Sequence, residues 1–263
     1  RASQAMSPGW ALRKGAGRRA STMVTIMPQP LGRAFCKEAA TLKDVPNSEA
    51  LASWLHKRGL NTETWGQGDT KGVEKFWKEI KDNESSLELW LCEDGTLQVL
   101  RVTHVLRAKV CSRKSYSKGV FLFNTWQQYG DGRKRFRNGL LSEKLTVDET
   151  PLEDHLHEVC QRAVTEEEMA RVVSSKFVIK EGSPVPEYDS QIQCPLQVED
   201  EVLTEKTVEI EPSKSYPGLL TMYNLYTVDI ICGGLPDVDF NTLEFEHEDK
   251  NGHRRLKYVH AWI

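Results

Sequence analysis

Several common features are missing from this sequence of 263 residues, and each absence narrows the range of functions. No run of about 18 apolar residues occurs, so we expect no transmembrane helix, and membrane association would require a partner protein. No Cys-X-X-Cys pair is present, which argues against a zinc site. The six cysteines are therefore expected to be free thiols in a reducing compartment, with Cys160 and Cys232 buried as small apolar residues.

Acidic residues are absent from the first 37 positions, which carry seven basic residues, so the remaining chain has a net charge of about -10 by subtraction from -3. This stretch is rich in Arg, Ser and Ala, a composition typical of an organelle transit segment. A disordered basic arm that binds nucleic acid or an acidic surface is the alternative. We assign residues 1–46 to an extended basic arm or the remnant of a transit segment.

Residues 47–86 are expected to form a short helical extension. In NSEALASWLHKRGL and in KGVEKFWKEIKD, apolar residues recur at helical spacing, and Asn47 or Ser48 provides an N-cap. The extension contains Trp54, Trp65 and Trp77, and their side chains are expected to be exposed. These three residues either pack on the main domain or anchor a partner protein.

From residue 87 to residue 263 the pattern changes to that of strands. The segment LELWLCEDGTLQVLRVTHVLRAKV alternates in polarity on both sides of an Asp-Gly turn, which predicts a hairpin. Further strands are expected in GVFLFNTWQQY, IQCPLQVEDEVLTEKTVEIE and LLTMYNLYTVDIICGGL, followed by a closing antiparallel pair, TLEFEHED with RLKYVHAWI. One long helix is inserted after the third or fourth strand. The chain is therefore expected to be α+β, with a mixed sheet in a three-layer α/β/α sandwich.

A basic segment, GDGRKRFRNG, is expected to be a loop. Four cations surround Phe136 in it, a composition suited to a phosphate, a nucleotide or RNA, and they are Arg133, Lys134, Arg135 and Arg137. A solvated hairpin tip, or ion pairing with the acidic remainder of the domain, is the alternative.

The inserted helix is expected in DETPLEDHLHEVCQRAVTEEE, where carboxylates at helical spacing could converge on one hard cation. The order of a strand, the basic loop, LLSEKL, the acidic turn DETP and a helix resembles the Nudix hydrolases, over about Leu97 to Ile263. The Nudix box of that family runs Gly, five residues, Glu, seven residues, then Arg-Glu-apolar-X-Glu-Glu. The resemblance implies a Nudix-like fold and, for an intact box, Mg²⁺-dependent hydrolysis of a nucleoside-diphosphate-linked substrate.

In one register of this resemblance, Glu149 takes the glutamate of the loop and Glu158 the first glutamate of the helix. Gln161 and Arg162 then replace the paired glutamates, and Glu143 stands in place of the glycine. We expect Arg162 to pair with Glu158, four residues earlier, so that an ion pair replaces the metal.

In the other register, Glu166 and Glu167 keep the paired glutamates, and Ala163 replaces the first one. This alignment needs about five extra residues before the helix, and it leaves weak metal binding conceivable. Neither register restores the complete box, so neither catalysis nor a cofactor is expected.

A second resemblance concerns SYPGLLTMYNLYTVDIICGGLP together with WGQGDTKGVEKFWKEI, which are similar to segments of Nudix-like proteins of algal and plant plastids that have no established reaction. It implies a chloroplast location in preference to a mitochondrion. The expected function is a non-catalytic scaffold or accessory subunit that binds other proteins of an organellar assembly. The alternative is a Mg²⁺-dependent hydrolase with Glu158, or Glu166 and Glu167, as metal ligands; a nucleotide- or RNA-binding module without chemistry is the third hypothesis.

Overall fold

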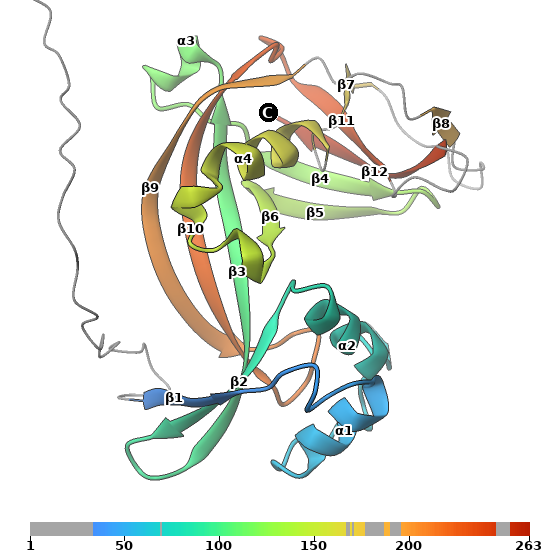
Figure 1. The fold of residues 1–263 in the computed structure, drawn as a ribbon. Helices are drawn as coiled ribbons and strands as arrows, with labels where there is room; N and C mark the ends of the chain where they lie inside the picture. The colour runs from blue at the N-terminus through green and yellow to red at the C-terminus, as the bar shows by residue number, and fades with distance from the viewer. Residues whose placement is uncertain are drawn as a thin grey trace, which may run out of the picture.

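The computed structural model describes residues 34–68, 70–166, 169, 171–176, 187–189, 196–245 and 253–263. These residues form two six-stranded β-sheets and a small number of short helices, so the expected α+β class is confirmed. Helix α4 (Leu156–Thr165) lies between the two sheets (Figure 1), and its buried face contributes to the same apolar core as both of them. The expected single mixed sheet is thus replaced by two sheets that share one helix.

The first sheet has the strand order β1-β2-β3-β10-β9, and β6 pairs with the second half of β3. Its strands are β1 (Ala34–Ala39), β2 (Ser86–Cys92), β3 (Leu97–Cys111), β6 (Leu141–Leu145), β9 (Gln197–Pro212) and β10 (Leu220–Gly233). Strands β3 and β10 run parallel and the other pairs antiparallel, so the sheet is mixed. The β2–β3 hairpin confirms the expected Asp-Gly turn, in which Gly95 has a φ of 81°.

The second sheet has the order β5-β4-β12-β11-β7, with β8 paired to β12. Its strands are β4 (Asn124–Tyr129), β5 (Lys134–Gly139), β7 (Arg171–Ser174), β8 (Glu187–Asp189), β11 (Phe240–Phe245) and β12 (His253–Trp262). The expected closing pair, β11 with β12, is confirmed. The basic segment was expected to be a loop, and this is wrong for most of it: a tight turn at Gly132 brings β5 back along β4 as an edge strand.

Helices α1 (Ser48–His56) and α2 (Val73–Lys81) confirm the two expected amphipathic stripes. They pack on the first sheet, since Leu51, Leu55 and Phe76 lie in one cluster with Leu87 and Val99. The end of the expected basic arm is also part of this sheet, since β1 pairs with β2. The first 33 residues lie outside the described part of the chain.

The remaining helical elements are short. They are α3 (Arg113–Tyr116) and two 3₁₀ turns, η1 (Val147–Glu149) and η2 (Leu152–Asp154). Helix α4 buries Val159, Cys160, Ala163 and Val164 completely, and full burial of each valine contributes roughly 1.5–3 kcal/mol. The described cysteines are free thiols, and Cys160 and Cys232 are buried as expected. No helix in the described ranges is long and apolar enough to cross a membrane.

Candidate functional site

The acidic turn before α4 is not part of the helix. Thr146 and Glu149 form a capping box around η1, in which the Thr146 N–H donates to the Glu149 carboxylate at 2.8 Å. Pro151 then precedes η2, and α4 begins only at Leu156. The helix is therefore shorter than the sequence suggested, and Glu149 approaches it from a preceding turn.

Arg162 lies at the centre of this site. Its guanidinium donates to both oxygens of Glu149, one of them through Nη2 at 3.3 Å, and lies 3.5 Å from a carboxylate oxygen of Glu143 on β6. Burial alone would raise the pKa of Glu149, but the hydrogen bonds from Arg162 and Thr146 outweigh it and lower the pKa. A permanently charged guanidinium thus lies between two acidic side chains.

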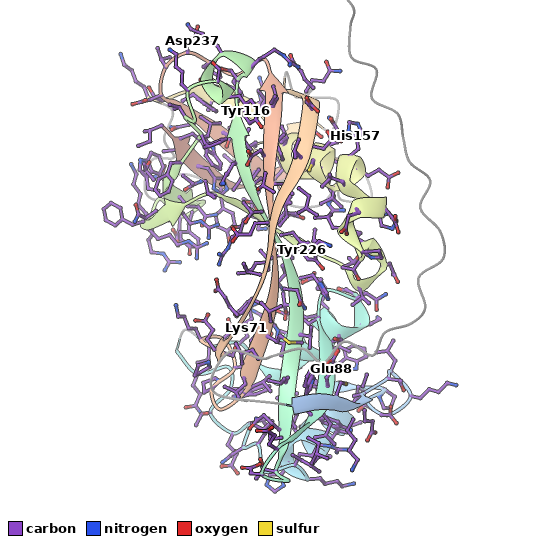
Figure 2. The ribbon with its side chains drawn as sticks, turned by 90° about the vertical axis from the view of Figure 1, so that its left-hand side faces the viewer. Lys71, Glu88, Tyr116, His157, Tyr226 and Asp237 are labelled. Atoms are coloured by element: carbon purple, nitrogen blue, oxygen red, sulfur yellow. The ribbon has the colours of Figure 1, made fainter. Side chains whose placement is uncertain are left out.

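The expected ion pair between Glu158 and Arg162 is wrong. The Glu158 side chain is 84% exposed, and one of its carboxylate oxygens lies 3.9 Å from the imidazole Nδ1 of His155. His157 points from α4 towards Glu201 of β9, 3.2 Å away, and the residue is labelled in Figure 2. The two histidines thus contact different carboxylates. The i,i+4 partner of Arg162 was outcompeted by two carboxylates that are closer in space and less exposed.

The residues of the other register are only partly described. Glu166 follows α4 as its C-cap and is exposed, Ala163 is buried, and Glu167 lies outside the described residues. Within the part of the chain that the structure describes, no group of three or more His, Cys, Asp and Glu side chains is arranged to hold a metal ion.

The three tryptophans were expected to be exposed, and this is wrong for Trp54 and Trp65. Trp54 is buried under the guanidinium of Arg58, 3.6 Å from the ring centroid, and Trp65 is buried with its indole N–H donating to the Pro217 carbonyl at 2.9 Å. Trp77 is partly exposed, and its indole donates to the Val45 carbonyl at 2.9 Å. Each ring instead fixes a connection within the chain.

A buried charge cluster, which the sequence reading missed, joins α2 to the first sheet. The Glu79 carboxylate accepts from Lys71 at 2.6 Å and from Arg101 at 2.8 Å, and Lys144 of β6 lies 3.3 Å away. The hydroxyl of Tyr216 also donates to it, at 3.1 Å. Burial disfavours the charged form of Glu79, but Arg101, Lys144 and Lys71 reverse this effect and lower its pKa to about 2.

This charge cluster holds three distant segments together. Tyr216, in the loop before β10, packs its ring against Phe76 at 4.6 Å and Trp65 at 5.0 Å between centroids. Lys71 lies in the same half of the molecule as the N-terminal helices (Figure 2). A signal was available in the sequence, because Arg101 is a charged residue in the middle of an apolar strand, where it requires a buried partner.

A second buried network lies in the second sheet. His260 is fully buried on β12, and its Nε2 lies 2.7 Å from a carboxylate oxygen of Glu244 on β11. Lys257 donates to the other oxygen at 2.6 Å, and the Asn124 amide contacts the His260 Nδ1 at 3.1 Å. Burial raises the pKa of Glu244, but His260 and Lys257 lower it further than burial raises it. A His–Glu pair can orient or move a proton, but full burial of this histidine favours a structural role.

The basic segment brings its predicted residues together on the β4–β5 hairpin. Lys134 lies over the ring of Trp126, 4.1 Å from its centroid, and the guanidinium groups of Arg133 and Arg135 each lie 5.3 Å from the centroid of Tyr129. Arg137 is on the same edge strand. Arg133 and Arg135 therefore lie beside Tyr129 on one face of the hairpin, and Lys134 lies beside Trp126 on the other.

No family model, curated protein or solved structure matches this chain. Its function therefore has to be inferred from its own geometry.

Proposed function

We propose that this chain is a Nudix-like protein without catalytic activity, which serves as a scaffold or accessory subunit of an organellar protein assembly, in a plastid rather than a mitochondrion. The order of β4, β5, β6, an acidic turn and α4 supports the Nudix-like part of the proposal. The basic composition of the first 37 residues and the resemblance to plastid proteins support the location.

One observation carries the loss of catalysis. The guanidinium of Arg162 is held by Glu149 of η1 and Glu143 of β6. A metal-dependent hydrolase of diphosphates needs carboxylates that converge on a cation, which then polarises the phosphoryl group and activates water. Arg162 places a permanent positive charge between these two carboxylates, and Glu158, which would otherwise be a ligand, extends into solvent.

Calorimetric titration of the full chain with Mg²⁺ and with Mn²⁺ tests the proposal. We expect no saturable binding at millimolar metal, and no hydrolysis of ADP-ribose, used as a nucleoside-diphosphate-linked probe. Binding in the wild type that is lost in Glu158→Gln would restore the hydrolase in the first register. Binding that is lost in Glu166→Gln/Glu167→Gln would restore it in the second.

The scaffold role makes a separate prediction. In an extract of the source cells, the full chain should elute in an assembly much larger than the free chain, and crosslinking should join it to the same proteins in repeated preparations. Elution as a free monomer at its natural abundance would contradict a subunit role, even if the metal titration is negative.

A further inference from the structure

The β4–β5 hairpin presents an unusual combination of side chains, which we call the hairpin platform: Trp126, Tyr129, Arg133, Lys134, Arg135 and Phe136. Successive side chains of a strand point to opposite faces, so Lys134 and Phe136 share a face of β5. Trp126 is the direct cross-strand partner of Phe136 and lies on the same face. The residues of the platform therefore lie on one hairpin at the edge of the second sheet.

Phe136 is the most informative member of the platform. Phe136 is 91% exposed, although aromatic side chains normally bury most of their surface. Trp126, its cross-strand neighbour, is covered by the ammonium group of Lys134 instead. Within the described ranges no aromatic ring contact involves Phe136, and its exposure leaves the ring accessible to a ligand.

The cations of the platform are available for a ligand with several negative charges. Within the described residues, Lys134 has no ion-pair partner, and Arg135 donates to the neutral amide oxygen of Gln127, at 2.6 Å. Arg133 pairs with Asp131 in the turn, but that pair is exposed to solvent and is worth little. The platform therefore has a positive surface charge on a chain whose net charge is -3.

Protection of an edge strand explains the cations but not the phenylalanine. Lysine and arginine on an edge strand prevent pairing with other chains, and an exposed Phe136 on the same strand works against that protection. A stacking role explains both features, because an open aromatic face flanked by cations is what single-stranded nucleic acids bind.

We propose that the hairpin platform binds single-stranded nucleic acid. One base stacks on the open face of Phe136, and Lys134, on the same face of β5, contacts a phosphate next to it, while Arg133 and Arg135 lie beside Tyr129 on the opposite face and add attraction at longer range. Stacking on an aromatic ring accepts any base, so the binding has little sequence preference. This proposal goes beyond the scaffold role and depends on none of the residues around Arg162.

Fluorescence anisotropy with the full chain and a labelled RNA of about 12 nucleotides and mixed sequence tests the platform. Phe136→Leu keeps an apolar side chain but removes the π-face, and it should weaken binding by about 5-fold or more. Phe136→Trp should restore it. Lys134→Ala should make the slope of log K against log salt shallower by about 0.7, the value for one phosphate contact on a single strand.

A matched pair of controls comes from α3, which also combines cations with a partly exposed aromatic residue and lies at the other end of the molecule from the N-terminal helices (Figure 2). Tyr116→Leu and Lys114→Ala should leave the affinity within about 2-fold. The basic residues near the N-terminus are identical in all variants, so their contribution cancels in the comparison. An RNA of the same length without bases separates stacking from charge alone.

Three outcomes would overturn the proposal. Phe136→Leu could bind as tightly as the wild type, or the RNA without bases could bind as tightly as the complete one, which would leave only a charged patch. A glutamate peptide of equal length could compete as well as the RNA, which would assign the platform to an acidic protein. Circular dichroism of the variants verifies folding, which an exposed position such as Phe136 should not disturb.

Discussion

Replacing Glu79 by Gln removes the carboxylate at the centre of the buried charge cluster between α2 and the first sheet. Arg101 depends on it most, because its side chain is 6% exposed and its Nε already has no hydrogen-bond partner in the described structure. Removing one partner of a buried ion pair typically costs about 3–5 kcal/mol. Lys71 and Lys144 are each more than a third exposed and can turn towards water, so they add little to this cost.

The cost should depend on pH. The pKa of Glu79 is lowered from 4.5 to about 2 in the folded chain, so its charge stabilises the fold above pH 4.5. That stabilisation is lost as the pH falls through the interval between these two values, and amounts to about 3 kcal/mol in total. At pH 3 about 2 kcal/mol of it should already be gone, because most of the unfolded chains then carry a proton on this residue.

Urea unfolding at pH 7 and pH 3, followed by tryptophan fluorescence, measures the cost of the substitution and its dependence on pH. Trp65 reports on this region because it packs against Tyr216, which contacts Glu79. The gap in unfolding free energy between wild type and Glu79→Gln should be about 3–5 kcal/mol at pH 7 and about 2 kcal/mol smaller at pH 3. Glu84→Gln is the matched control: Glu84 also pairs with Lys144, at 2.9 Å, but is 40% exposed, so we expect a loss below about 1 kcal/mol. A cost of Glu79→Gln below about 1 kcal/mol at pH 7, or a gap that is equal at both pH values, would refute the electrostatic account.

Three further predictions concern stability. Arg162→Met should cost about 1.5–3 kcal/mol in urea unfolding, because it removes the charged hydrogen bonds to Glu149; a cost near zero would show that the pair is not formed in solution. Glu244→Gln should lower the free energy of unfolding by about 1–3 kcal/mol, because it leaves His260 and its neighbours imperfectly paired. The difference between wild type and variant should become smaller as the pH falls, because the pKa of Glu244 is lowered in the fold. Equal stability of wild type and variant at pH 7 would contradict the network. Phe136→Ala should change the melting temperature very little, since substitutions at exposed positions change the free energy of unfolding by at most about 0.5 kcal/mol. A large drop in melting temperature would mean that the ring packs against the chain.

Elements defined by a local pattern could be predicted from the sequence. Apolar residues at helical spacing gave α1 and α2, and alternation around Asp94 and Gly95 gave the β2–β3 hairpin. These predictions succeed because the pattern and the structure involve neighbouring residues. The strand β5 was missed because four cations around one phenylalanine resemble a solvated loop, and only its pairing with β4 makes it a strand.

The candidate site was predicted only in part. The helix that carries Glu158 and Arg162 was expected, but the i,i+4 rule named the wrong partner for Arg162. That rule considers one helix in isolation, whereas Glu149 reaches the guanidinium from a 3₁₀ turn and Glu143 from a strand. Similarly, three tryptophans that resembled exposed anchors have their indole faces or N–H groups engaged within the chain.

By itself the sequence determined the local elements and the cluster of cations on one segment, since each of these is a matter of which residues are present and how they are spaced. Tertiary structure decided which charges meet: Glu79 with Arg101, His260 with Glu244, and Arg162 with Glu149. Such pairs join separate elements, and burial makes their partners obligatory without leaving a regular spacing along the chain.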